Sequence, residues 1–201
     1  MRTVEVTDAL QEYLDGLVPP RDRVLARMEE EAHSENIPIV DPHEGMLLYL
    51  LVKIAGAKRI LELGTATGYS GIWLLRGTEG GSLTTFEVDH KRADRARANF
   101  ADAGLGEQAL VLEQDAVVGL PKIDQRFDAC FIDLLNVFPS EEMTQRAFEL
   151  CLERLEGLQR AGGEASAPGE RGDANSRRSV RREGQRLSTV THLWLQRGVI
   201  R

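Results

Sequence analysis

The feature that most constrains the fold is a glycine-bounded turn between a short apolar run and a helical pattern. Residues 59–63, Arg-Ile-Leu-Glu-Leu, are typical of a buried strand, and Gly64 and Gly68 bound the turn that follows. From Tyr69 to Arg76 the apolar spacing predicts a helix. A strand that turns directly into a helix predicts one unit of an open parallel α/β sheet.

Strand-like and helix-like runs alternate along the rest of the chain. Further strands are expected at 82–87, 109–112 and 127–133, and further helices at 91–103, with Asp89 as N-cap and Gly104 as stop, and at 141–158, with Ser140 as cap. Before the turn we expect a helix capped by Asp8 and ended by Pro19, and helices at 21–33 and 44–55. This order predicts an α/β fold with a mainly parallel sheet and helices on both faces.

The turn favours a ligand other than a dinucleotide. A dinucleotide fingerprint, G-x-G-x-x-G, needs glycine at the three positions that here hold Gly64, Ala66 and Tyr69. The chain also lacks the G-K-[ST] run of a P-loop. Glycine lets a ligand approach the backbone closely, and the N–H groups at a helix N-terminus favour a carboxylate. A ligand with an amino-acid end and a ribose therefore fits this turn better than a pyrophosphate.

Acidic residues end or follow each of the four expected strands. Glu62 is placed to meet the ammonium group of an amino-acid ligand, and Glu87 to bind ribose hydroxyls. Asp115 and Ala116 follow the third strand, where an adenine can lie, and Asp133 ends the fourth. Because the carboxyl ends of parallel strands share one edge of a sheet, we expect these residues to lie near each other. For each acid taken alone, the alternative is a strand end or helix cap without a ligand.

Residues from about 36 to 158 resemble the cation-dependent O-methyltransferases, the family that includes catechol and caffeoyl-CoA O-methyltransferases. The segments that carry the resemblance are Val-Asp-Pro-His-Glu-Gly at 40–45, Ala-Lys-Arg-Ile-Leu-Glu-Leu-Gly-Thr-Ala-Thr-Gly-Tyr-Ser at 57–70, Leu-Thr-Thr-Phe-Glu-Val-Asp at 83–89, Asp-Ala at 115–116 and Phe-Asp-Ala-Cys-Phe-Ile-Asp at 127–133. The resemblance implies a Rossmann-like class I methyltransferase fold. We expect one domain over residues 1–201, with a helical cover at 1–56 and a donor-binding core at 57–158.

The resemblance implies transfer of the methyl group of S-adenosylmethionine to a hydroxyl of a small catechol-like or phenolic acceptor. The donor-binding residues that it implies are Val40, Glu62, Gly64, Thr65, Ser70, Glu87, Ala116 and Asp133. To these we add Gly68 from the turn and Asp115 from the end of the third strand. In this family a divalent cation, usually Mg²⁺, orients the acceptor hydroxyls and lowers their pKa. Asp133 is thus the expected catalytic and metal-binding residue, and a homodimer is the expected assembly.

The sequence departs from the family pattern after Asp133. Asn136 stands where the family has a lysine, and Gln-Arg-Ala at 159–161 stands about where it has an adjacent Asp-Asn pair. Asp173 and Asn175 are not adjacent and follow no apolar strand. Three explanations stay open: a divergent tail on a metal-independent or inactive donor-binding protein, a shifted reading frame, or a site that a partner chain completes.

The end of the chain differs from the rest in composition. Gly, Ala, Ser and Arg dominate residues 159–189, which makes the fifth-strand region atypical and predicts a divergent segment of loop or disorder. Apolar side chains return in residues 190–201, a candidate closing strand. The arginine-rich run at 177–182 can bind RNA or an acidic membrane, but a solvated segment is the favoured interpretation.

Composition and charge narrow the class of protein. The formal net charge is −7, but residues 160–201 carry nine arginines and four acids, so the excess of acid lies in residues 1–159. An acidic body disfavours a nucleic-acid surface, although a tRNA hydroxyuridine methyltransferase stays as one alternative. A donor-binding protein with impaired catalysis is the other. With two cysteines, no long apolar run and no signal-like N-terminus, we expect a cytoplasmic protein without a membrane segment.

Overall fold

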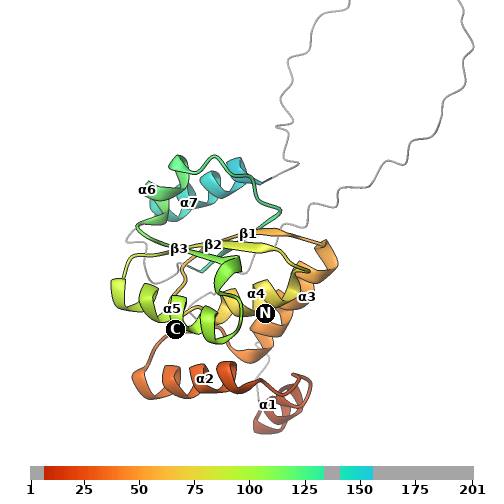
Figure 1. The fold of residues 1–201 in the computed structure, drawn as a ribbon. Coiled ribbons are helices and arrows are strands. Elements are labelled where there is room, and N and C mark those ends of the chain that lie inside the picture. Colours follow the sequence, from red (N-terminus) through yellow and green to blue (C-terminus); the bar gives the residue numbers. More distant parts are fainter. Residues whose placement is uncertain (1–6, 134–140, 156–201) are drawn as a thin grey trace, which may run out of the picture.

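The structure is a computed structural model that describes residues 7–133 and 141–155 (Figure 1). Its elements in chain order are α1 (Asp8–Asp15), α2 (Arg23–Glu35), α3 (Pro42–Ala55), β1 (Arg59–Leu63), α4 (Tyr69–Gly77), β2 (Ser82–Glu87), α5 (His90–Asp102), η1 (Gly106–Gln108), β3 (Ala109–Glu113), α6 (Ala116–Gly119), η2 (Leu120–Lys122), β4 (Ala129–Ile132) and α7 (Glu141–Arg154). The expectations for Asn136, for Ser140, for the divergent segment 159–189 with its fifth-strand region, and for the closing strand 190–201 fall outside the described residues.

The four described strands form one parallel sheet in the order β3-β2-β1-β4. β1 lies between β2 and β4, so that Ile60 pairs with Leu83 on one side and with Ala129 on the other. The chain adds strands outward from β1 to β3 and then returns to the far side of β1 for β4. The strand order therefore reverses beside β1, and ligands of open α/β sheets bind at such a point. The predicted Rossmann-like α/β fold is confirmed.

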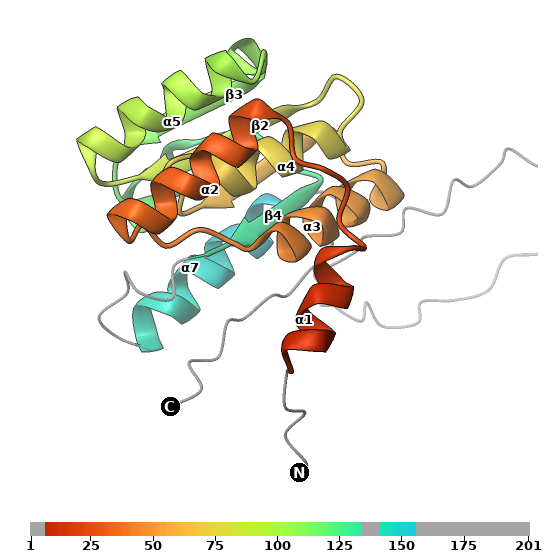
Figure 2. The same ribbon diagram turned by 90° about the horizontal axis from the view of Figure 1, so that it is seen from below.

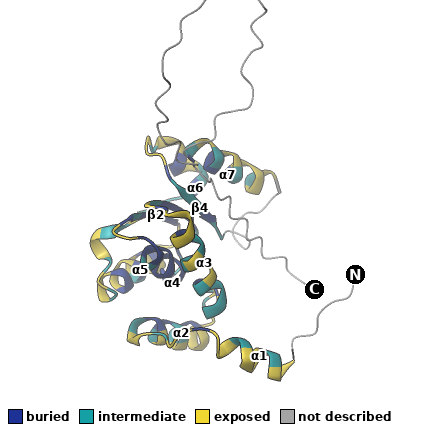
Figure 3. Ribbon diagram, turned by 90° about the vertical axis from the view of Figure 1, so that its right-hand side faces the viewer, coloured by how far each residue is buried: buried dark blue, intermediate teal, exposed yellow. Residues whose placement is uncertain are grey.

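Helices cover both faces of the sheet, as predicted (Figures 1 and 3). α3, α4 and α5 lie on one face, and α6 and α7 lie on the other. Successive side chains of a strand point to opposite faces, so Ile60 and Leu83 join the core under α4, whereas Leu61 and Phe86 join the core under α7. Among the described residues, no helix combines the length and hydropathy needed to cross a membrane.

α2 forms an outer layer across α4 and α5 (Figure 2). The Tyr69 hydroxyl at the start of α4 donates to Glu29 at 2.7 Å. Arg27 donates to the Asn99 side chain on α5 at 3.0 Å, and further ion pairs join Arg27 to Asp102 and Arg95 to Glu31 and Glu35. Polar contacts therefore fasten this helix over the side of the sheet that carries the glycine turn.

The N-cap of α1 and the first residues of α2 and α3 differ from the predictions, because side-chain caps determine where these helices begin. The expected N-cap Asp8 is wrong: Thr7 is the N-cap, and its hydroxyl accepts from the N–H of Leu10 at 3.3 Å. α3 begins at Pro42 rather than at residue 44, because Asp41 and Glu44 form a reciprocal capping box. α2 begins at Arg23 rather than at residue 21, since Asp22 accepts the first N–H groups of that helix.

Two elements, β4 and α7, are shorter than predicted. β4 covers Ala129–Ile132 rather than 127–133, since Phe127 forms only an isolated bridge with Leu155. That bridge follows directly after α7, which ends at Arg154 rather than at residue 158. The short helix α6 has no predicted counterpart, because four residues are too few to show a helical period.

Candidate functional site

The candidate site lies at the carboxyl ends of β1 and β2, where the glycine turn joins β1 to α4. The N–H groups of Gly64 and Thr65 both donate to the carbonyl of Phe86, at 3.1 and 3.0 Å, and tie the turn to β2. Gly68 is the N-cap of α4 with a φ of 90°, and a Cβ there would lie 3.1 Å from the Phe100 ring. Both the backbone conformation and the close approach therefore call for glycine at this position.

Glu62 lies beneath the turn and is wholly buried. Ser70 Oγ donates to its Oε1 at 2.6 Å, and Thr85 Oγ1 donates to its Oε2 at 2.7 Å. Burial raises the pKa of Glu62 to about 7; the two hydroxyl donors lower it, and the charges of Asp133 and Glu87 raise it. Near neutral pH this carboxyl is therefore divided between its acid and ionised forms, and a cation bound nearby favours the ionised form.

Glu87, the last residue of β2, also holds the turn. Its Oε2 accepts the N–H of Ala66 at 2.8 Å, and its Oε1 accepts those of Val88 and Asp89 at 3.0 and 2.9 Å. Ala66 has a φ of 45°, which is uncommon for a residue other than glycine, and the bond to Glu87 helps to hold it there. A carboxylate accepts about four hydrogen bonds, so Glu87 retains capacity for a ligand hydroxyl.

The first turn of α4 combines features that suit both charges of an amino acid. Gly68 has no side chain to cap the N–H groups of this turn. The helix dipole and such N–H groups favour a carboxylate. Ser70 lies in the same turn and is bonded to Glu62, so a buried acid lies beside the anion-favouring helix end.

Three other residues predicted to bind the donor, Asp115, Ala116 and Val40, have structural roles in the fold. Asp115 caps α6 by accepting the N–H groups of Val117 and Val118 at 2.7 and 3.2 Å, which is the helix-cap alternative for this acid. Ala116 is buried in the first position of that helix, and Val40 is buried just before α3. Donor contacts for Asp115, Ala116 and Val40 stay predictions.

Asp133 directly follows β4, and its N–H donates to the carbonyl of Leu63 at 2.9 Å, beside Glu62. Within residues 7–133 and 141–155, no three His, Cys, Asp or Glu side chains are grouped so that they could hold a metal ion. Mg²⁺ takes several oxygen ligands, so Asp133 alone does not fit it. Positions 159–161, where the family pattern places further ligands, lie outside the described residues. The metal-binding role of Asp133 stays a prediction.

Two buried polar side chains that build the site were not predicted from the sequence. Thr85 faces Glu62 from β2, and Asn99 on α5 donates its amide to the carbonyl of Thr67 at 2.9 Å. Asn99 is buried between the apolar Ala96 and Phe100 of its helix. A polar residue within an apolar strand or helix face was the available signal, since buried polar groups must find partners.

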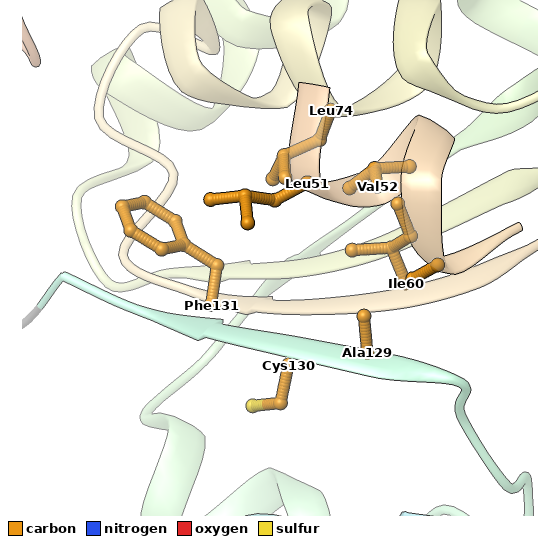
Figure 4. A pocket seen from close by; sticks show the side chains of 8 residues that line it. Leu51, Val52, Ile60, Leu74, Ala129, Cys130 and Phe131 are labelled. Carbon is orange, nitrogen blue, oxygen red and sulfur yellow. The ribbon is translucent and has the colours of Figure 1, made fainter. Parts of the chain in front are cut away.

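An apolar hollow lies between α3 and β4 (Figure 4), and Phe131 in its lining pairs with Glu62 in the register of β1 and β4. Leu51 and Val52 line it from α3, and Ala129 and Phe131 line it from β4. Its lining contains no charged side chain. It therefore offers nothing to bind the charged groups for which the glycine turn is suited.

Comparison with known proteins agrees with the features of the turn. A family model described as O-methyltransferase matches residues 21–155, so the similarity begins before residue 36. A catechol O-methyltransferase of Niastella koreensis is 34% identical over 136 residues, which are 64% of this chain and 62% of that protein. A probable O-methyltransferase of Mycobacterium tuberculosis is 35% identical over 131 residues, 63% of this chain and 57% of that protein. The chain thus spans less than two thirds of the length of either relative.

Solved structures give the same result. The O-methyltransferase from Bacillus cereus in complex with SAH is 35% identical and superimposes with a TM-score of 0.65, over 73% of this chain and 68% of that one. TomG from Streptomyces achromogenes in complex with SAM is 28% identical, with a TM-score of 0.65 over 73% of this chain and 67% of that one. These similarities show the predicted class I methyltransferase fold. Because the family model also matches most of its length, the chain belongs to the O-methyltransferase family.

Proposed function

We propose that this chain binds S-adenosylmethionine at the glycine turn and transfers its methyl group to a hydroxyl oxygen of a small acceptor. The observation that carries the proposal is the placement of two acids on adjacent strands. Glu62 lies buried under the turn with Ser70, and Glu87 accepts the Ala66 N–H at the next strand end. Family membership and the SAH and SAM bound to similar structures support it.

The charged groups of the donor determine how we place it in the site. Its carboxylate is received by the N–H groups that follow Gly68, and its ammonium group by the negative charge of Glu62. The ribose hydroxyls are assigned to Glu87, and the adenine to the end of β3. The remaining residues proposed at the donor are Val40, Gly64, Thr65, Ser70, Asp115, Ala116 and Asp133.

The reaction itself requires alignment more than acid–base chemistry at the donor. The acceptor oxygen attacks the methyl carbon in line, the carbon–sulfur bond breaks, and its electron pair stays on sulfur to give S-adenosylhomocysteine. The acceptor loses its hydroxyl proton to solvent or to a base. Binding both substrates at one sheet edge supplies proximity. Because the described donor set does not fit Mg²⁺, the proposal includes no step through a metal.

The proposal extends to the acceptor class and to the assembly. A catechol-like or phenolic acceptor is supported by the name of the Niastella relative. The helices within residues 1–56 are proposed to cover the acceptor side, in one domain with the donor-binding core at 57–158. A homodimer is proposed as the assembly.

Calorimetric titration with S-adenosylhomocysteine tests the donor half of the proposal. We expect binding in the micromolar range, which is about 8 kcal/mol, and its loss in Glu87→Ala. Glu107→Ala is the matched control, because it removes an exposed acid from η1, which precedes β3 at the opposite end of that strand. A folded wild-type protein that does not bind this ligand would contradict the proposal. The acceptor half is tested by mass spectrometry of catechol incubated with donor and protein, with and without Mg²⁺.

A donor-binding protein without transfer activity is the second candidate function. It is favoured by Asn136 at the position of the family lysine and by the lack of a metal-holding cluster within the described residues. Binding of S-adenosylhomocysteine without methylation of catechol under either metal condition would support it. Methylation of tRNA, seen as a mass shift, would instead point to the hydroxyuridine alternative that the acidic body disfavours.

A further inference from the structure

The buried carboxylate of Glu62 is held by a residue from the neighbouring strand. Thr85 stands directly opposite Glu62 in the parallel register of β1 and β2. Its Oγ1 donates to Glu62 Oε2 at 2.7 Å, and both side chains are wholly buried. The Oγ1 atoms of Thr85 and Thr65 lie 2.5 Å apart. Thr85 therefore contacts both the acid beneath the turn and a residue of the turn.

The direction of these hydrogen bonds follows from the number of protons. A threonine hydroxyl has one proton and two lone pairs. Because Thr85 gives its proton to Glu62, the proton between the two threonines belongs to Thr65. The bonds therefore run from Thr65 to Thr85 to Glu62 Oε2, while Ser70 donates to Oε1. Each carboxylate oxygen thus has its own hydroxyl donor.

These hydrogen bonds stabilise the ionised form of Glu62, which burial disfavours. Desolvation raises the pKa of Glu62 to about 7, and the bonds from Ser70 and Thr85 act against it. Hydrogen bonds from neutral donors to an ionised acceptor are among the strong ones. They also fix the carboxylate in one orientation. Without Thr85, Oε2 would lose this donor inside a site that water does not reach.

We propose that Thr85 is a positioning residue of the donor site: its hydroxyl fixes the orientation of the Glu62 carboxyl under the glycine turn and favours its ionised form, for the ammonium group of the donor. The inference rests on the proposed donor binding. It predicts that Thr85 matters for ligands with an amino-acid end and not for the nucleoside alone. A purely structural role would weaken the binding of both kinds of ligand.

Titration of three variants with two ligands tests this selectivity. Thr85→Val removes the hydroxyl and keeps the branched shape, Thr85→Ser keeps the hydroxyl, and Thr84→Val is the control. Thr84 is buried on the same strand, but strand alternation points it to the opposite face of the sheet. The ligands are S-adenosylhomocysteine and 5′-methylthioadenosine, which has the same nucleoside without the amino-acid end.

We expect Thr85→Val to weaken S-adenosylhomocysteine binding about 10- to 100-fold, which is the range for a lost hydrogen bond to a charged group. Binding of 5′-methylthioadenosine should stay within about twofold, because the nucleoside does not depend on the ammonium site. Thr85→Ser should restore most of the affinity, and Thr84→Val should bind both ligands like the wild type. If Thr85→Val does not fold, Thr85→Ala serves instead, since it places no methyl group against the carboxylate.

The outcomes separate this inference from the proposed function. A wild-type protein that binds no S-adenosylhomocysteine overturns the donor site itself. Wild-type binding with an unchanged affinity in folded Thr85→Val leaves the donor site in place and overturns the role of Thr85. Equal weakening for both ligands also overturns it, because the residue then supports the fold of the site and not the charge of Glu62.

Discussion

Asn99 on α5 donates its side-chain amide to the carbonyl of Thr67 at 2.9 Å, and so holds the glycine turn from the helix that packs behind it. The Oδ1 atom of the same buried side chain accepts from Arg27 Nη2 on α2 at 3.0 Å. These bonds run from the outer helical layer through α5 to the turn. The helices before β1 and the candidate donor site are therefore coupled by hydrogen bonds.

Replacing Asn99 by Leu, which has a similar size, should destabilise the protein and weaken donor binding. The Thr67 carbonyl would stay buried without its donor, which costs about 1–3 kcal/mol. Urea denaturation measures the stability, and titration with S-adenosylhomocysteine measures the binding. Asp102→Ala is the control: it removes an exposed carboxylate from the end of the same helix and leaves both bonds of Asn99 in place, so we expect a loss of at most about 1 kcal/mol. Equal losses of stability and of affinity in the two variants would contradict the prediction that the Asn99–Thr67 hydrogen bond supports the donor site.

Local sequence patterns were enough to predict the four described strands and a parallel sheet, but the order of the strands in the sheet was not predicted. Residues 59–63 and 82–87 have the predicted bounds: Lys58 and Gly64 flank the first run, and Gly81 precedes the second. The exact helix starts required knowledge of which side chain turns back to accept an N–H. Thr7 rather than Asp8, and Asp41 with Glu44, became caps because of their backbone angles, which composition does not specify.

The candidate site was predictable only where its residues belong to one strand–turn–helix unit. Glu62 and Ser70 are eight residues apart, and the turn brings them together. Thr85 and Asn99 reach the same turn from another strand and another helix. Their contacts depend on the register of β1 with β2 and on the rotation of α5, which follow from packing of the whole domain. A single sequence contains no direct signal for either.

Gly45 on α3 should not accept a larger side chain, for a reason unconnected with the donor. A Cβ at this position would lie 2.4 Å from Trp73 Nε1 on α4, and both residues are buried. We expect Gly45→Ala to lower the free energy of unfolding by about 1–3 kcal/mol through overpacking. Gly16→Ala, at the C-cap of α1, is the control, because its Cβ would meet nothing closer than 3.4 Å. Thermal or urea unfolding compares them, and similar stabilities would contradict the predicted clash.

Glu62 should make the stability of the protein fall as pH rises from about 4.5 to 7. Its pKa in the folded protein is raised from 4.5 to about 7 by burial. Between these values the folded protein holds a proton that the unfolded chain has released, so the free energy of unfolding decreases with pH. A shift of this size corresponds to roughly 3 kcal/mol, which is fully lost above the higher pKa.

The variant Glu62→Gln isolates this contribution, because its amide does not titrate and all other groups titrate in both proteins. Urea denaturation of the two proteins at several pH values measures the difference in their free energies of unfolding. We expect Glu62→Gln to gain roughly 3 kcal/mol relative to the wild type between about pH 4 and pH 8, whatever their difference at low pH. A difference that stays constant over this range would mean that the folded protein does not disfavour the Glu62 carboxylate. A saturating concentration of S-adenosylhomocysteine should reduce the gain, because the ligand ammonium favours the same ionised form that burial opposes.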